Sequence, residues 1–227
     1  LRWKEQGFSA VKMGWGGFEL PQFECVKLVE ATRNAIGDDM DMMLDIGFIP
    51  SGDFNVTAAS RLLLINEIRE FKPYWIEEAV YPDDYEGYKM LVESTDVRIA
   101  GGENETTRYG FKQLIEVCKL DILQPDITRC GGLTEAKRIG AMATAHNTTV
   151  IPHAWSSGIV IAASLHFIAT QSNSNLLEYC VWDTPIRKEM LKQDFKLRDG
   201  YVDVPMGPGL GIEIDDEAIQ KYRCDII

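Results

Sequence analysis

Three short apolar runs each end in a carboxylate: Met42-Met43-Leu44-Asp45, Tyr74-Trp75-Ile76-Glu77 and Ile99-Ala100-Gly101-Gly102-Glu103. Turn residues bound each run and an amphipathic segment follows it, a pattern that predicts a buried strand followed by a helix. The acids recur at intervals of about 30 residues, the length of one βα unit. Because neighbouring parallel strands end at the same edge of a sheet, we expect the three carboxylates to lie together.

Such a cluster of acids needs a compensating charge. Two carboxylates about 4 Å apart repel each other by roughly 4 kcal/mol at an effective dielectric constant near 20. A cation or bound protons must therefore offset the repulsion. Among divalent cations, an all-oxygen site on a rigid scaffold suits Mg²⁺ best, with Mn²⁺ and Ca²⁺ behind it.

The strand and helix pattern repeats along most of the chain. Seven strands are predicted near residues 8–13, 42–45, 74–77, 99–103, 120–126, 149–153 and 175–179. Six helices are predicted between them, near residues 21–36, 56–71, 84–93, 107–118, 132–145 and 159–170. Strict alternation of this kind indicates a parallel sheet, which is either doubly wound or closed into a barrel.

The polar residues favour the barrel. One of them stands at the carboxyl end of every predicted strand: Lys12, Asp45, Glu77, Glu103, Asp126, His153 and Glu178. An open sheet brings only the strands beside its switch point to a site, whereas a barrel brings all of them to one mouth. We therefore predict a (β/α) barrel of the TIM type.

Both ends of the chain depart from this pattern. Residues 1–7 are typical of the last turns of a helix, and a complete barrel has eight strands. We therefore expect residues 1–190 to form a partial barrel with strands two to eight, the first strand being absent. Residues 191–227 leave the alternation, and Asp199-Gly200 is a hairpin signal.

Composition excludes several classes of partner. The chain has 227 residues, 45% of them hydrophobic, and a formal net charge of −12. This charge disfavours a nucleic acid or an anionic membrane surface as a partner. No apolar run is long enough for a membrane span, and the first residues do not form a signal peptide. Five cysteines without a Cys-x-x-Cys pair indicate reduced thiols, so we expect a cytoplasmic protein.

Eight short motifs occur in order at barrel spacing: Val11-Lys12-Met13, Leu44-Asp45, Trp75-Ile76-Glu77-Glu78, Gly102-Glu103-Asn104, Gln124-Pro125-Asp126 with Arg129-Cys130-Gly131-Gly132, Pro152-His153, Leu177-Glu178 and Pro208-Gly209-Leu210-Gly211. Together they resemble the enolase superfamily, and within it the mandelate racemase subgroup that includes acid-sugar dehydratases. The resemblance implies a modified barrel with an N-terminal capping domain, against which residues 202–227 would pack. That domain is expected in a longer polypeptide of which this sequence is the C-terminal portion.

The resemblance also implies roles for the acids. Asp45, Glu77 and Glu103 would bind Mg²⁺, with Mn²⁺ as an alternative. Strand alternation separately indicates that Glu77 and Glu78 cannot both face the barrel interior. We therefore expect Glu78 to face outward, where an ion pair is the ordinary structural role.

The resemblance likewise implies an Asp126–His153 dyad. A carboxylate beside an imidazole raises the imidazole pKa and fixes its tautomer, which suits proton transfer near neutral pH. Glu178 would hydrogen-bond the substrate carboxylate or the intermediate. Trp15 and Trp155 are candidates for lining the substrate pocket, and Arg129 would contact a neighbouring carboxylate or anchor its loop.

Two departures from the subgroup bear on the reaction. Where its members commonly carry Lys-x-Lys, this chain has Lys12-Met13-Gly14, and its Glu-Glu-Pro motif reads Glu77-Glu78-Ala79. The missing second lysine argues against racemisation, which needs proton transfer on both faces of the substrate. Lys12 itself could bind the substrate carboxylate, act as the base, or support another group.

The function implied by the resemblance is that of a lyase. A hydro-lyase of this type would remove the proton alpha to the carboxylate of an acid sugar and form a 2-keto-3-deoxy sugar acid. A racemase, epimerase or cycloisomerase on the same scaffold, or a non-catalytic barrel fragment, remain the alternatives. The expected partners are a small hydroxy acid or sugar acid and further copies of the chain in a homo-oligomer.

Overall fold

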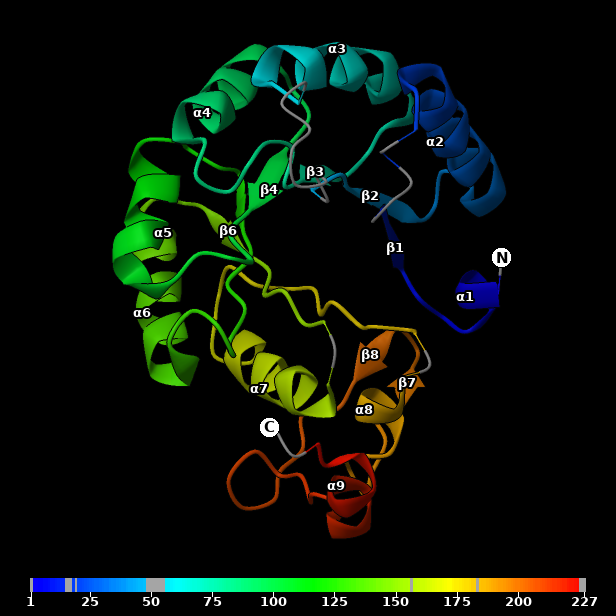
Figure 1. The fold of residues 1–227 in the computed structure, drawn as a ribbon, viewed down its shortest axis with the longest axis vertical. Helices are drawn as coiled ribbons and strands as arrows, with labels where there is room; N and C mark the ends of the chain where they lie inside the picture. Colours follow the sequence, from blue (N-terminus) through cyan, green and yellow to red (C-terminus); the bar gives the residue numbers. More distant parts are fainter. Residues whose placement is uncertain are drawn as a thin grey trace.

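A parallel sheet of six strands forms the centre of the protein (Figure 1). The computed structural model describes residues 2–14, 18, 20–47, 56–155, 157–182 and 184–224. The strands follow one another in chain order, and each pairs in parallel with the next. They are β1 (Ala10–Gly14), β2 (Asp41–Asp45), β3 (Trp75–Glu77), β4 (Ile99–Gly101), β5 (Ile122–Leu123) and β6 (Thr149–Val150).

Helices cover the outside of this sheet and separate its strands in sequence. They are α2 (Gln22–Ile36), α3 (Ala58–Ile68) with the short η1 (Arg69–Phe71), α4 (Tyr85–Ser94), α5 (Thr107–Glu116), α6 (Gly132–Ala145) and α7 (Gly158–Ile168). Figure 1 shows α2 to α6 as an arc around the strands. All six predicted helices are therefore confirmed, and side-chain caps begin several of them, including Thr57 before α3 and Ser157 before α7.

Alternation along the strands separates an inner from an outer apolar layer. Leu44, Ile76 and Ile99 belong to the large core between the strands and the helices. Their neighbours Met43, Trp75 and Ala100 form a second cluster with Ile122 and Ile151. Successive residues of a strand point to opposite faces, so the second cluster fills the interior of the curved sheet. This is the interior packing expected of a barrel.

The seventh predicted strand, at residues 175–179, is not formed as a strand. Near it, Val150 N donates a backbone hydrogen bond to Asn173 O, but no ladder follows in the described residues. Side chains nevertheless join this segment to the far edge of the sheet. Lys12 Nζ lies 2.7 Å from Glu178 Oε1, and the rings of Phe8 and Tyr179 are 5.8 Å apart. Side-chain contacts, rather than strand pairing, therefore hold Glu178 beside the sheet.

The remaining elements lie at the two ends of the chain. Helix α1 (Arg2–Glu5) precedes β1 and lies within residues 1–7, for which helix was predicted. After α8 (Pro185–Lys188), β7 (Leu197–Arg198) and β8 (Tyr201–Val202) form the predicted hairpin, and α9 (Asp216–Tyr222) follows. Apolar residues after position 190, including Leu191 and Phe195, pack against α7. Packing of residues 202–227 on a further domain stays a prediction.

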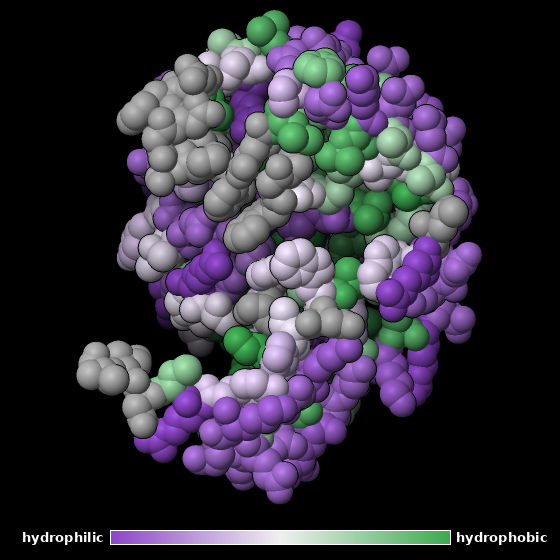
Figure 2. Space-filling view, turned by 45° about the vertical axis from the view of Figure 1, so that its right-hand side comes forward, coloured by the Kyte–Doolittle hydropathy of each residue, from purple (hydrophilic) through white to green (hydrophobic). Residues whose placement is uncertain are grey.

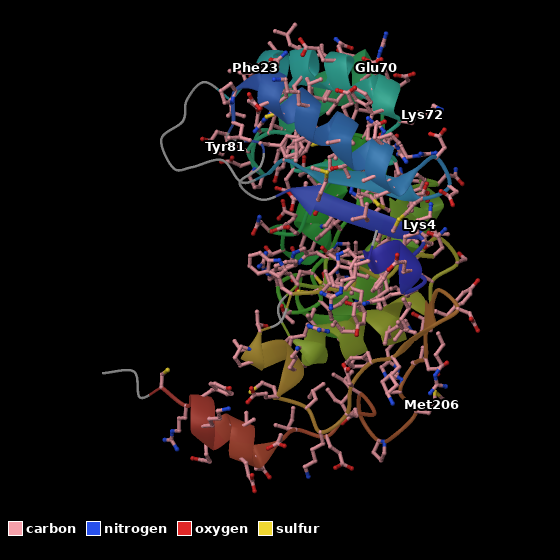
Figure 3. The ribbon with its side chains drawn as sticks, turned by 90° about the vertical axis from the view of Figure 1, so that its right-hand side faces the viewer. Lys4, Phe23, Glu70, Lys72, Tyr81 and Met206 are labelled. Carbon is pink, nitrogen blue, oxygen red and sulfur yellow. The ribbon has the colours of Figure 1, made fainter. Side chains whose placement is uncertain are left out.

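The two ends of the sheet differ in their surroundings. Figure 3 shows the β1 arrow pointing to the side where Phe23 and Tyr81 lie, with Lys4 and Lys72 at the other end. The face seen in Figure 2 is hydrophilic over most of its rim, and hydrophobic residues gather around a hollow nearer its centre. Among the described residues, no helix combines the length and apolar character that a membrane crossing needs.

Candidate active site

Three carboxylates meet at the carboxyl ends of neighbouring strands. Asp45 ends β2, Glu77 ends β3, and Glu103 stands in the turn that follows β4. One oxygen atom from each of the three lies within 4.8 Å of the others. Asp45 and Glu77 are buried, with 8% and 0% of their surface exposed. The three acids therefore lie close together in the structure, as the sequence predicts.

The acid cluster is electrostatically strained. Burial, followed by the negative charge of Glu77, raises the pKa of Asp45 to about 7. Two basic side chains balance part of the negative charge of the cluster, because Lys12 contacts Glu77 and Arg129 contacts Glu103. Carboxylate oxygens are the donors that Mg²⁺ and Mn²⁺ prefer, and their spacing allows all three to reach one ion. The residues therefore fit the cation that the sequence predicts.

Lys12, on β1, bridges two acids. Its Nζ lies 2.5 Å from Glu77 Oε1 and 2.7 Å from Glu178 Oε1. Burial disfavours the charged ammonium, but the carboxylates of Glu178, Glu77 and Asp45 outweigh burial and raise the pKa of Lys12. Lys12 is consequently a fixed positive charge inside the mouth of the barrel.

His153 and Asp126 form a buried pair. His153 Nδ1 lies 2.7 Å from Asp126 Oδ2, and His153 Nε2 lies 3.3 Å from Glu103 Oε2. Burial opposes charge on the imidazole, but the hydrogen bond to Asp126, followed by the charges of Glu178 and Glu103, raises the pKa of His153. For Asp126, burial is outweighed by hydrogen bonds from His153 and Thr128, which lower the carboxyl pKa. The ring therefore faces the acid cluster through Nε2.

Glu178 contacts both Lys12 and the segment that carries His153. Its Oε1 contacts Lys12, and its Oε2 accepts a hydrogen bond from Ala154 N at 2.8 Å. Burial works to raise the pKa of Glu178, but the charges of Lys12 and His153 prevail and lower it. Because Ala154 directly follows His153, this hydrogen bond ties the two segments together at the mouth.

The other candidate residues lie around this centre. Arg129 Nη1 is 3.2 Å from Glu103 Oε1, and Arg129 Nε is 3.8 Å from Asp126 Oδ2, so Arg129 bridges the acid cluster and the histidine pair. Trp155 follows His153 by two residues and is exposed. Its ring lies 5.8 Å from that of Trp182, also exposed. Trp15 lies outside the described residues.

Sequence reasoning did not single out Trp182, gave Gln124 no role, and expected a different contact for Glu78. Trp182 sits beside Trp155 but follows no predicted strand, so no pattern singled it out. Gln124 is 2% exposed, and its Oε1 has no hydrogen-bond partner among the described residues. Glu78 is buried without an ion pair in the described part of the chain, and burial raises its pKa to about 8. The ion pair expected for Glu78 is thus absent there, and its carboxylate instead accepts a hydrogen bond from Gly102 N.

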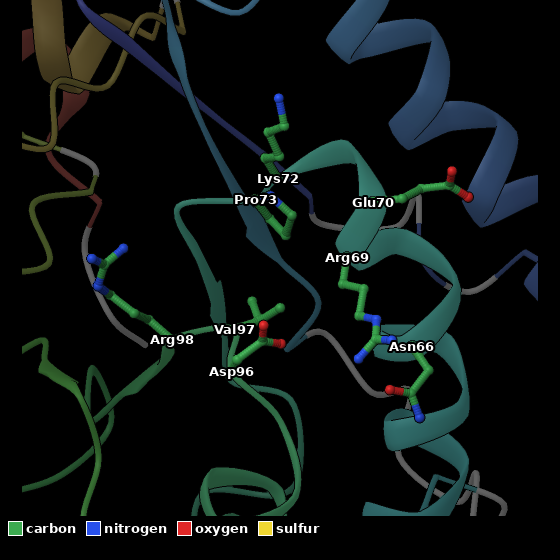
Figure 4. Close-up of a pocket in the computed structure, with 8 residues that line it drawn as sticks. All are labelled: Asn66, Arg69, Glu70, Lys72, Pro73, Asp96, Val97 and Arg98. Carbon is green, nitrogen blue, oxygen red and sulfur yellow. The ribbon is translucent and has the colours of Figure 1, made fainter.

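A pocket of about 610 Å³ lies at the opposite end of the sheet (Figure 4). Its walls come from the end of α3, from η1 and from the segments that lead into β3 and β4. It contains arginine and lysine side chains but none of the acids or the histidine described above. The candidate chemistry therefore belongs to the carboxyl ends of the strands, where barrel enzymes place their active sites.

Comparisons with known proteins agree with this arrangement. D-galactarolactone cycloisomerase from Agrobacterium fabrum is 33% identical over 97% of this chain and 58% of its own length. D-galactonate dehydratase from Cronobacter sakazakii is 36% identical over 86% of this chain and 51% of its own length. The chain thus spans little more than half the length of these two curated relatives.

Solved structures give the same picture. The 3,6-anhydro-D-galactonate cycloisomerase from Zobellia galactanivorans superposes with a TM-score of 0.87 and 36% identity, covering 97% of this chain and 60% of that structure. The six-stranded α/β sheet is therefore that of a barrel-like domain found in larger proteins. A sequence model of the enolase C-terminal domain-like family matches residues 1–218. With sequence, fold and acid cluster in agreement, the chain belongs to the enolase C-terminal domain-like family.

Proposed function

We propose that this protein removes the proton alpha to the carboxylate of an acid sugar with the help of Mg²⁺, and that the usual outcome is dehydration to a 2-keto-3-deoxy sugar acid. The observation that carries the proposal is the convergence of Asp45, Glu77 and Glu103 beside the His153–Asp126 pair. The similarity to a D-galactonate dehydratase and a D-xylonate dehydratase supports this reaction class. The alternative of a non-catalytic fragment would leave the buried charges without a role.

Asp45, Glu77 and Glu103 would hold the cation. Bound Mg²⁺ acts as a Lewis acid on a substrate carboxylate and makes the neighbouring C–H bond more acidic. Through a bound cation, the three carboxylates would also bring the reacting end of the substrate beside His153, because Glu103 Oε2 is 3.3 Å from His153 Nε2. The reacting carbon atoms would then lie within reach of the histidine.

His153 would move protons through Nε2. Asp126 holds Nδ1 at 2.7 Å and so fixes the orientation of the ring. A base takes the alpha proton, the electron pair forms the C=C bond of an enol, and the C–O bond to the β-hydroxyl breaks. His153 delivers the proton that converts the departing hydroxide into water, and the enol becomes the keto acid. Where the two groups leave from one face, His153 would also be the base that takes the first proton.

Lys12 and Glu178 would handle the substrate carboxylate. Lys12 is held between Glu77 and Glu178, which keeps its ammonium group beside the acid cluster. Of the roles open to Lys12, binding the anionic end of the substrate agrees best with this arrangement. Glu178 would orient the lysine and hydrogen-bond the reacting group.

Replacing Lys12 with methionine tests that role. A hydrogen bond to a charged group contributes about 1.5–3 kcal/mol, so we expect KM for an acid sugar to rise roughly 10- to 100-fold. Lys12→Arg, which keeps the charge, should retain more of the affinity. Steady-state kinetics separate the alternatives, because a fall in kcat with an unchanged KM would make Lys12 the base.

Cycloisomerisation is the second candidate reaction. It begins with the same abstraction of an alpha proton, and two cycloisomerases are among the similar proteins. The reactions differ in what leaves: dehydration releases water, whereas cycloisomerisation opens or forms a ring without loss of atoms. Epimerisation or racemisation would need a second base, and the glycine at position 14 stands where that lysine is expected.

Product analysis decides between these reactions. A library of aldonic acids, aldaric acids and their lactones is incubated with the protein and Mg²⁺ in D₂O. Dehydration gives a keto acid that semicarbazide traps, and cycloisomerisation gives an isomer of unchanged composition. Metal binding without deuterium exchange at any alpha carbon would instead support a non-catalytic barrel.

A further inference from the structure

Glu78 occupies an unusual position directly after the candidate metal ligand Glu77. It is 4% exposed, and its φ of 50° lies in the left-handed region that side chains other than glycine rarely adopt. Since Glu77 faces the barrel interior, Glu78 faces the outer layer, which lies between the strands and the helices. A buried carboxylate on a strained backbone contributes poorly to stability, so a local role has to account for it.

On one side, Glu78 fixes the segment that carries Glu103. Its Oε1 accepts a hydrogen bond from Gly102 N at 2.8 Å, and Gly102 immediately precedes Glu103. The fit here is close, because a Cβ at Gly101 would lie 3.1 Å from Glu78 Oε1 and 3.0 Å from the hydroxyl of buried Tyr88. The carboxylate therefore packs directly against the end of β4.

On the other side, Glu78 packs against the segment that carries Asp45. A Cβ at Gly47 would lie 2.1 Å from Glu78 Cβ, so the glutamate fills the space that a side chain at Gly47 would need. Gly47 N in turn donates a hydrogen bond to Asp45 Oδ1 at 3.0 Å. Glu78 thus touches the backbone beside Asp45 and beside Glu103, and it is the residue that follows Glu77 in the chain.

We propose that Glu78 is a positioning residue that fixes the spacing of the three carboxylates from behind the cation site. This inference rests on the proposed function, since it assigns a cation to those carboxylates. Glu78 acts through the ends of β2 and β4 and contacts no substrate. Without its hydrogen bond, the turn that carries Glu103 loses a restraint, and the three oxygen atoms no longer converge as tightly.

Isothermal titration calorimetry with Mg²⁺ and Mn²⁺ tests the proposal without relying on turnover. Glu78→Ala removes both contacts and should weaken metal affinity roughly 10- to 100-fold, the loss typical of residues that orient metal ligands. Glu78→Asp is one methylene too short to reach Gly102 N and should weaken affinity by a smaller factor while it preserves the fold. Glu78→Gln keeps an oxygen acceptor and should stay within about threefold of the wild type.

Asp121, just before β5, provides a matched control because it contacts the opposite end of β4. Its Oδ2 accepts a hydrogen bond from Ile99 N at 2.9 Å, at the end of β4 away from the site. Asp121→Ala should lower the melting temperature but leave metal affinity unchanged. Wild-type affinity in both Glu78→Asp and Glu78→Ala would overturn the positioning role, as would equal losses in Asp121→Ala. If the wild-type protein binds neither cation at millimolar concentration, the proposed function fails as well.

Discussion

Asp45→Asn should weaken Mg²⁺ binding by more than about 100-fold and remove measurable turnover. Loss of a residue that only orients a metal ligand typically costs 10- to 100-fold in affinity, and Asp45 would itself be a ligand. The amide keeps the size of the side chain but removes the negative charge that the cation needs. Calorimetric titration of the metal-free protein measures the affinity directly.

The same variant carries a stability prediction of opposite sign. Because burial and Glu77 raise the pKa of Asp45 to about 7, ionised Asp45 destabilises the metal-free fold at higher pH. At pH 8 with a chelator present, Asp45→Asn should therefore melt at a higher temperature than the wild type. The gain should shrink as the pH falls towards the ordinary pKa of an aspartate.

Asp41→Asn, at the exposed start of the same strand, is the control for both measurements. It should leave metal affinity unchanged and should not raise the melting temperature at pH 8. If Asp45→Asn binds Mg²⁺ as tightly as the wild type, the cation lies elsewhere. If it also lowers the melting temperature at pH 8, the acid cluster is a structural network.

His153→Asn should reduce kcat by about 10²- to 10⁴-fold, the range that a general acid or base contributes. The variant should bind Mg²⁺ nearly as well as the wild type, because His153 contacts Glu103 without belonging to the three carboxylates. Deuterium exchange at the alpha carbon distinguishes two forms of the mechanism. Exchange is lost if His153 is the first base, and it persists if His153 serves only as the acid for the departing hydroxyl.

His146→Asn is a matched control, since His146 is exposed at the end of α6 and away from the site. It should leave both kcat and metal affinity unchanged. A His153→Asn protein that loses Mg²⁺ binding together with activity would contradict the assignment, because it would make His153 part of the metal site. Unchanged turnover in His153→Asn would exclude the histidine from proton transfer altogether.

The helices and the first six strands could be predicted because their signals are local. The 2-residue and 3.6-residue periods of apolar side chains depend on short stretches of sequence, as in Met42-Met43-Leu44-Asp45 and in α2. Residues 175–179 carry the same apolar signal as a strand, but strand formation also requires a backbone partner. Their pairing is decided by distant residues, so the local pattern predicted a strand that the structure does not form.

The amino-acid sequence by itself determined the alternating architecture and the residues that would meet at the mouth. Polar residues that end or closely follow parallel strands lie at one common edge of the sheet, so the meeting of Asp45, Glu77, Glu103 and His153 was predictable from their places in the chain. The tertiary structure alone decided how charge is shared among them. Lys12 bridges Glu77 and Glu178 across the sheet, and Glu78 packs against Gly47 and Gly102. Such contacts depend on the curvature of the sheet and on burial, which no local period in the sequence encodes.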